Sequence, residues 1–262
     1  MIAFQLNDEM HPIEKWAQIE LKLFFMTQPM LNKIIGLLLV IMTFAINPAW
    51  SQDTGELKTF YTTLGGEIIF SWADASVNGD KANTIVRFSP VFNLQSQLHW
   101  DKSEKLGFFS GLGIRNVGFI FDDPTQVNVR YKMRSYTLGI PFAVKFGDMD
   151  DRFFFAGYEL EFPFNYKEKK FVNEDKEDKS SDWFSKRTPA IYQSVFVGVQ
   201  APYGIQLKFK YYLSNFVDTD YVANDGNGNP TYPYQNFDAN VYYISLSWQF
   251  LRNAEFMVRD KE

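Results

Sequence analysis

The chain has 262 residues, no cysteine, a formal net charge of −5, and 18% aromatic residues beside 22% charged ones. This length suits one domain with a leader, the acidic balance argues against nucleic-acid binding, and the lack of cysteine excludes disulfides, thiol catalysis and cysteine-based metal sites. So many rings in so charged a chain are unusual for a soluble core and favour a barrel with aromatic girdles and a polar interior.

The most apolar segment covers residues 34–46 and reads IIGLLLVIMTFAI. As a helix it would rise about 20 Å, which is short of the roughly 30 Å hydrocarbon core of a membrane. Lys33 precedes it, and Ala49 and Ser51 stand before Gln52 in the spacing of a cleavage site. We therefore expect a secretory signal peptide rather than a membrane anchor. The expected segments are a mis-assigned extension at 1–29, a signal peptide at 30–51, a lead-in at 52–60, a barrel at 61–251 and a tail at 252–262.

From Tyr61 onward, apolar and polar residues alternate with a period of two, as in strands with two different faces. Leu138 and Ile140, for example, alternate with Thr137 and Gly139. Each run is about as long as the roughly 9–11 residues of a tilted membrane strand. We expect such strands at about 66–72, 86–98, 106–115, 135–146, 154–162, 189–200, 205–213 and 242–250, the sixth being the weakest pattern.

The connections between these runs alternate in length. Short turns are expected at 100–105, 147–151 and 201–204, and longer loops at about 73–83, 122–129, 165–188 and 216–238. Periplasmic turns and surface loops alternate in this way in outer-membrane barrels. The alternative is a soluble lipocalin-like barrel, but its apolar residues would face inward and leave the outward rings unexplained.

The signal peptide, the eight alternating strands and the aromatic last strand resemble the small outer-membrane β-barrels of the OmpA-domain, OmpX and porin-like type. The resemblance covers about residues 60–251, is architectural, and brings no catalytic motif. It implies an all-β, eight-stranded antiparallel up-and-down transmembrane barrel in the cell outer membrane of a Gram-negative cell. One departure is the C-terminus, because Phe250 is followed by a tail containing Phe256. Either ring is a candidate signal for the barrel-assembly machinery.

Eight charged residues are expected to point into the barrel. An eight-stranded barrel is only wide enough to be filled by its side chains, so these charges should meet one another. Two carboxylates two residues apart point the same way, and arginines can bind them bidentately. The structural interpretation is an ion network that plugs the lumen, and the functional one is a gated ion path or a catalytic carboxylate pair. The residues are Glu67, Arg87, Arg115, Lys145, Glu159, Glu161, Lys208 and Lys210.

An enzyme is the less favoured interpretation. Downstream of the leader the sequence holds a single histidine, His99, at the expected periplasmic end of the second strand beside Trp100. Chemistry on outer-leaflet lipid needs a base at the other rim, so His99 is expected to be an interfacial polar residue. No nucleophile–base pair is recognisable, and no catalytic residue, cofactor or metal site is expected.

The two longest loops carry the remaining candidates. Residues 166–187 mix lysines with acidic residues, which suits a solvated extension of the strands or contact with lipopolysaccharide or a partner. Residues 224–229 superficially resemble a calcium loop, but Pro230 and Asn236 occupy the places of the required Gly and Glu. Gly/Asn turns are expected there instead. Tyr221, Tyr232, Tyr234 and Phe237 are expected to form either an aromatic contact surface or loop packing.

The sequence thus predicts a non-enzymatic outer-membrane barrel with a charge-plugged lumen that acts in envelope integrity or surface contact through its long loops. A narrow porin-like channel for ions or very small solutes is the second hypothesis, and a lipid-modifying barrel enzyme is the third. Expected partners are outer-membrane lipid, lipopolysaccharide and the assembly machinery. The surface partner is not specified by the sequence.

Overall fold

The computed structural model describes residues 59–149 and 152–257, with side chains described from Phe60 to Gln249. It consists of β-strands and one short 3₁₀ turn, η1 (Pro202–Gly204). No helix within this part of the chain is long and apolar enough to cross a membrane. The strands are β1 (Thr59–Val77), β2 (Asp80–Lys81), β3 (Asn83–Ile85), β4 (Arg87–Ser89), β5 (Leu94–Asp101), β6 (Leu106–Asp122), β7 (Val129–Gly147), β8 (Phe153–Val172), β9 (Asp175–Trp183), β10 (Tyr192–Ala201), β11 (Ile205–Tyr212), β12 (Ala223–Asn224), β13 (Pro230–Thr231) and β14 (Phe237–Met257).

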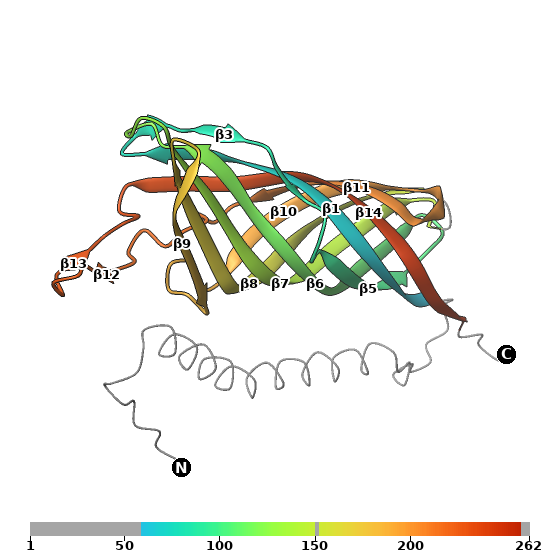
Figure 1. Ribbon diagram of the computed structural model, residues 1–262. Coiled ribbons are helices and arrows are strands. Elements are labelled where there is room, and N and C mark those ends of the chain that lie inside the picture. Colours follow the sequence, from blue (N-terminus) through green and yellow to red (C-terminus); the bar gives the residue numbers. More distant parts are fainter. Residues whose placement is uncertain (1–58, 150–151, 258–262) are drawn as a thin grey trace, which may run out of the picture. The chain divides into compact units, whose positions relative to one another are not determined.

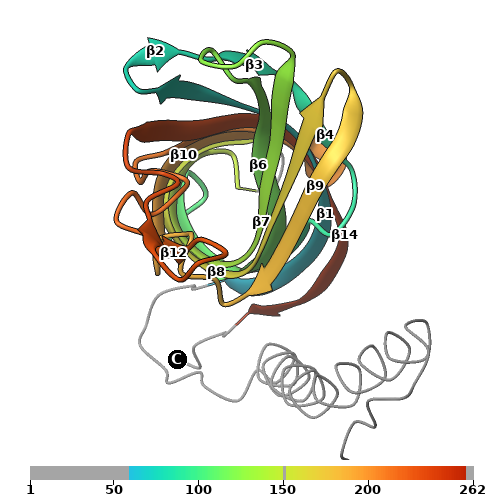
Figure 2. The same ribbon diagram turned by 60° about the vertical axis from the view of Figure 1, so that its left-hand side comes forward.

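Eight of these strands close into a ring. Their hydrogen-bonded order is β1-β5-β6-β7-β8-β10-β11-β14, with β14 antiparallel to β1 so that no edge remains within the ring. Figure 2 shows the ring from near one end, and Figure 1 shows it from the side. Chain neighbours pair with one another around the ring, which is the up-and-down arrangement. The expected fold class, an eight-stranded antiparallel barrel, is confirmed.

The outer surface of the ring is apolar. Large apolar side chains alternate outward along every strand of the ring, and Phe146, Phe154, Leu207 and Trp248 are all more than half exposed. A soluble barrel does not present so many large apolar residues to water, so the lipocalin-like alternative is wrong. This surface is what a transmembrane barrel presents to lipid.

Rings gather at both ends of the apolar surface. At the end with the short turns, Trp100 packs against Phe60 and Phe108 with ring centroids 6.1 and 5.3 Å apart. At the other end, Tyr136 contacts Phe92 and Phe164, and Phe164 stacks on Trp183 at 6.0 Å. We call this second group the loop-side belt: Phe92, Tyr136, Phe164 and Trp183.

Several strands continue well past the loop-side belt. β1, β7, β8 and β14 have 19, 19, 20 and 21 residues, about twice the length that a crossing requires. Two expected loops are therefore partly strand. Residues 78–79 form a tight Asn-Gly turn into β2, and residues 173–174, both with positive φ, turn β8 into β9. Within the segment 166–187, β8 and β9 pair as a β-hairpin up to Trp183, so much of the expected loop extends the strands.

The expected second strand, 86–98, is interrupted. β4 pairs with β1 and β5 pairs with both β1 and β6, but residues 90–93 belong to neither strand. Pro90 has no N–H to donate to a ladder, and Phe92 has a φ of 61°. Side chains replace the missing ladder hydrogen bonds at this break. The Arg87 guanidinium donates to the backbone carbonyl oxygen of Asn116 on β6, and the backbone N–H of Asn116 donates to the Asn93 side chain.

The barrel extends slightly beyond the expected 61–251. β1 begins at Thr59, within the expected lead-in, and β14 continues to Met257, within the expected tail. Arg252 and Phe256 pair with Thr63 and Phe60, because β1 offers ladder positions that far. The expected signal peptide and the segment before it lie outside the described residues.

Candidate functional site

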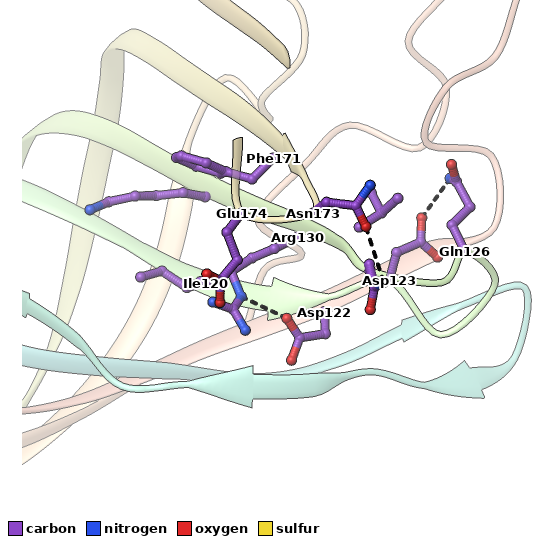
Figure 3. Close-up of a pocket in the computed structure, with 11 residues that line it drawn as sticks. Ile120, Asp122, Asp123, Gln126, Arg130, Phe171, Asn173 and Glu174 are labelled. Atoms are coloured by element: carbon purple, nitrogen blue, oxygen red, sulfur yellow. Dashed lines mark hydrogen bonds and ion pairs between the residues drawn. The ribbon is translucent and has the colours of Figure 1, made fainter. Parts of the chain in front are cut away.

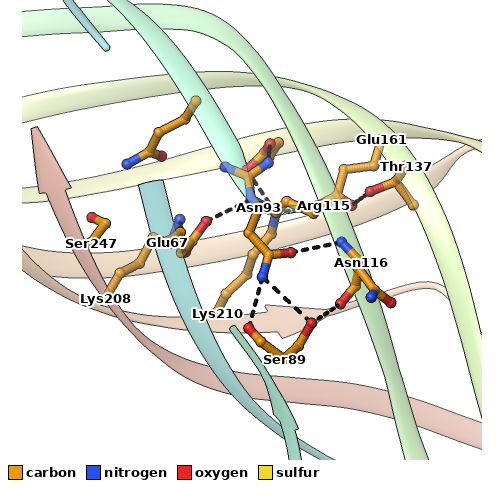
Figure 4. A network of polar contacts seen from close by, with 12 residues as sticks. Glu67, Ser89, Asn93, Arg115, Asn116, Thr137, Glu161, Lys208, Lys210 and Ser247 are labelled. Carbon is orange, nitrogen blue, oxygen red and sulfur yellow. Dashed lines mark hydrogen bonds and ion pairs between the residues drawn. The ribbon is translucent and has the colours of Figure 1, made fainter. Parts of the chain in front are cut away.

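Arg115 lies at the centre of the lumen and joins two carboxylates. Its Nε is 3.0 Å from Glu67 Oε2, and its Nη1 contacts Glu159. Arg115 comes from β6, Glu67 from β1 and Glu159 from β8, and all three side chains are buried. Arg115 thus bridges two acids with one contact each, in place of the expected bidentate contact with one carboxylate. Figure 4 shows Arg115 and Glu67 of this arrangement.

Two lysines of β11 complete the arrangement. Lys208 Nζ lies 2.8 Å from Glu67 Oε1. Lys210 Nζ lies 2.7 Å from Glu159 Oε2 and also contacts Glu161. Glu161 accepts further hydrogen bonds from Thr137 at 2.6 Å and from the Tyr212 hydroxyl at 2.8 Å. We call these six residues the central network: Glu67, Arg115, Glu159, Glu161, Lys208 and Lys210.

The central network is electrically balanced, with three carboxylates and three cations. Buried charges are costly unless each one is paired and hydrogen-bonded, and here each of them contacts at least one opposite charge. Small residues make room for it. A Cβ at Gly139 would collide with both the Glu159 carboxylate and Arg115. The side chains are therefore held in place by one another and by the wall.

Lys145 belongs to a second group nearer the short turns. It forms an ion pair with Asp101, its Nζ donates a hydrogen bond to the Tyr61 hydroxyl oxygen at 3.2 Å, and Nζ lies 3.2 Å from His99 Nδ1. His99 stacks on Tyr61 with a centroid distance of 4.5 Å and contacts Thr63 Oγ1 at 3.1 Å. His99 is only 1% exposed, so the expected interfacial position is wrong. His99 lies at one of the inward-facing positions of β5. The alternation of the sequence was the signal that could have placed it there.

Arg87 is the one predicted lumen residue without a carboxylate. It is buried, but its Nη1 and Nη2 donate to the carbonyl oxygen and Oδ1 of Asn116 at 3.0 and 2.6 Å. Within the described residues no acid pairs with it, and its Nε has no hydrogen-bond partner. The expected contact with Glu159 or Glu161 is therefore not made, because the break at residues 90–93 uses Arg87 to satisfy β6 instead.

Apolar clusters lie on both sides of the central network. The order is visible along β6, where Phe109 is followed by Arg115 and then by Val117 and Phe119. At the turn end the cluster consists of Phe109, Ala143, Met149, Phe153, Phe155 and Phe196. The larger cluster at the loop end includes Ile69, Val117, Phe119, Phe121, Met133, Tyr166, Tyr192, Phe216, Val217, Tyr234, Phe237 and Val241.

Sequence reasoning missed these clusters, although their residues lie at the inward parity of the same strands. Tyr234 and Phe237 belong to the loop-end cluster, so two of the four loop aromatics serve loop packing. Tyr221 packs against the same cluster, whereas Tyr232 is half exposed. The expectation of an aromatic contact surface is therefore not met by these four residues together.

A pocket of about 830 Å³ lies at the tips of β6, β7 and β8 (Figure 3). Arg130 pairs with Asp122 at 2.7 Å, and Asp123 accepts hydrogen bonds from Thr125 and Gln126. Its polar groups are thus largely engaged with one another. No cluster of three or more histidine, cysteine or acidic residues able to hold a metal ion occurs among the described residues. Asp225 in the calcium-like segment instead accepts the N–H groups of Asn227 and Asn229, as an Asn/Gly turn does.

Comparisons with known proteins give only distant likenesses to solved structures. No family model matches the chain, and no curated protein matches it. Among solved structures it is similar to Neisserial surface protein A, with 12% identity, a TM-score of 0.34 and coverage of 73% of this chain and 97% of that one. OprG of Pseudomonas aeruginosa has 13% identity and a TM-score of 0.33, with coverage of 75% of this chain and 98% of that one. Ail of Yersinia pestis has 10% identity and a TM-score of 0.30, with coverage of 75% of this chain and 100% of that one. The fold is that of a small outer-membrane β-barrel. That conclusion comes from the closed ladder and the apolar outer surface, because likenesses this distant add no detail.

Proposed function

We propose that this protein is a non-enzymatic outer-membrane barrel whose lumen is closed, and that it acts in envelope integrity or surface contact through its extended loop end. The observation that carries the proposal is the layered lumen: an apolar cluster, the balanced central network, and a second apolar cluster. An ion that entered would have to pass the loop-end apolar cluster, and at the turn end a lumen in which the apolar cluster lies beside buried polar residues such as Gln95, Gln97 and Gln206. It would also have to separate buried pairs, which stabilise one another only while they are intact.

A surface role is supported by the length of the strands. β1, β7 and β8 continue past the loop-side belt and, with β9, carry polar and charged side chains there. A barrel that only spanned the membrane would not need strands that extend beyond it. The orientation follows the usual rule that long loops face outward and short turns face the periplasm.

The experiment for this proposal has two readouts. Purified protein reconstituted in lipid vesicles should not increase the leakage of small ions. Proteinase K added to intact cells should cut within the loop that holds β12 and β13 and spare the turns at 102–105 and 202–204. Rapid leakage would favour the channel alternative, and cleavage at the short turns would invert the proposed orientation.

Outer-membrane lipid, lipopolysaccharide and the barrel-assembly machinery are the partners we propose. For assembly, the aromatic residues near the C-terminus, Phe250 and Phe256, are the candidate signals. Replacing each by Ala separately and measuring the fraction of heat-modifiable protein identifies which of them is used.

A further inference from the structure

The outer face of β7, β8 and β9 carries a patch of cations directly beyond the loop-side belt. The register places Lys132 opposite Lys169, Arg134 opposite Lys167, and Lys169 opposite Lys179. The intervening residues Met133, Ser135 and Tyr166 are buried, so the cations share the opposite, outward face. We call Lys132, Arg134, Lys167, Lys169 and Lys179 the cation patch.

These five cations have no carboxylate partner among the described residues, whereas their neighbours do. Arg130, two residues from Lys132, pairs with Asp122 at 2.7 Å, and Lys170 pairs with Glu177 at 2.8 Å. Like charges directly opposite each other destabilise a pair of strands. Burial first, and then repulsion by Arg134, Lys179 and Lys169, lowers the pKa of Lys167. The patch is therefore arranged for a negative group that the chain itself does not supply.

The belt fixes the depth of the patch. Tyr136 and Phe146 point outward ten residues apart on β7, about the length of one membrane crossing. Aromatic belts mark the boundary between hydrocarbon and headgroups. Arg134 lies 5.9 Å and Lys167 5.2 Å from the centroid of the Tyr136 ring. These cation–π contacts place both cations beside the loop-side belt.

Arg87 adds an independent sign of a missing anion. Its side chain is 3% exposed, its Nε has no partner, and it contacts Asn116 but no acid. The charged neighbours that act on it and on Lys132 include Arg134, another cation. A buried guanidinium that has another cation nearby and no carboxylate is costly unless an anion lies close to it.

We propose that the cation patch binds the phosphate groups of a glycolipid in the outer leaflet, the phosphorylated anchor of lipopolysaccharide. This inference rests on the proposed function only for the orientation that puts the loop end outside. Opposed strand residues have Cβ atoms about 4.5–5.5 Å apart, so one phosphate can contact two or three of these cations at once. Arginine adds a two-pronged donor to phosphate oxygens, and the lysines add point charges.

The test uses the full barrel in nanodiscs and measures binding of the bisphosphorylated glucosamine lipid by native mass spectrometry. The variant Arg134→Gln/Lys167→Gln should lose at least about tenfold in affinity, since each removed contact is charge-assisted. The matched control, Arg130→Gln/Lys170→Gln, removes the same charge from the same strands but from cations already paired, and should change affinity less than about twofold. Lipid stripped of its phosphates should bind all three proteins equally weakly.

Three results would overturn the proposal: equal binding by wild type and Arg134→Gln/Lys167→Gln, equal loss in the control, or undiminished binding of the dephosphorylated lipid. Competition by millimolar inorganic phosphate alone would assign the patch to free phosphate and reject the lipid. The heat-dependent gel shift of each variant checks that the barrel is folded. Because none of these side chains belongs to the central network, ion leakage through the wild-type barrel would contradict the closed lumen and leave this binding result intact.

Discussion

Arg115 on β6 binds Glu159 on β8 across the intervening strand β7, inside the barrel. An ion pair between strands that are not neighbours links the wall across the lumen and resists its separation. Each of these two residues also forms a second ion pair, Arg115 with Glu67 and Glu159 with Lys210. Removing one member therefore affects contacts on four strands.

Glu159→Gln should lower the free energy of unfolding by roughly 1–4 kcal/mol, because it leaves the buried Arg115 and Lys210 each with one fewer counter-charge. Urea unfolding in lipid vesicles, followed by tryptophan fluorescence, measures this change. Glu177→Gln removes an acid from the surface pair with Lys170 and should cost only about 0–1 kcal/mol. Equal costs for the two variants would show that the network does not stabilise the barrel.

Glu67 and Lys208 should be energetically coupled. Their 2.8 Å contact is buried, so Glu67→Gln should leave Lys208 without its carboxylate, and Lys208→Met should leave Glu67 with Arg115 alone. The double variant removes both charges together and should cost less than the two single variants combined, by about 0.5–3 kcal/mol. A double-mutant cycle of unfolding free energies gives this coupling directly. Strict additivity would contradict a functional ion pair at this position.

Gly139 tests how closely the wall fits the central network. An added Cβ would meet Glu159 and Arg115, so Gly139→Ala should destabilise the barrel by about 1–3 kcal/mol through overpacking. Gly226 lies in open space in the long loop, and Gly226→Ala is the matched control with little expected effect. Comparing the urea midpoints of unfolding of the two variants with that of the wild type shows whether the added Cβ at position 139 destabilises the barrel. A Gly139→Ala barrel as stable as wild type would mean that the network shifts easily.

Asp225 should give a pH-dependent loop. Hydrogen bonds from the Asn229 side chain, and then from backbone N–H groups, hold the pKa of Asp225 below its usual range. A depressed pKa in the folded state means that the loop is stabilised above the usual Asp pKa and loses this support as the pH falls through the lowered value. Carboxyl NMR titration measures it, and Asn229→Ala should raise the pKa toward normal. An unchanged pKa in that variant would contradict the turn geometry.

The period-two pattern predicted the ring well because lipid outside and a narrow lumen inside impose opposite polarity on alternate residues. Parity alone placed Glu67, Arg115, Glu159, Glu161, Lys208 and Lys210 where they meet. It could not supply register, and register decides depth along the barrel. Lys145 therefore pairs with Asp101 near the short turns, although its side chain points into the lumen as those of the central network do.

The break after β4, the apolar clusters and the strand extensions could not be predicted from the alternation of apolar and polar residues. Pro90 signals a possible break, but the sequence does not show that Arg87 then binds Asn116 instead of a carboxylate. The apolar clusters were overlooked because inward positions were expected to be polar, although Phe109 and Phe119 stand at inward parity. The strands beyond the belt were assigned to loops because residues 166–183 have charged side chains on both faces. The Asn78-Gly79 pair was a hairpin signal in one of these segments.

The closed lumen is tested most directly by single-channel recording in planar bilayers. Wild-type protein, with insertion verified by protease protection, should show no steady conductance, because the balanced central network and the apolar loop-end cluster occupy the lumen. Glu159→Gln should at most produce small, irregular events together with lower stability. Robust steady conductance of the wild type, with an ion selectivity that Glu159→Gln alters while stability is unchanged, would contradict the closed barrel and establish a channel.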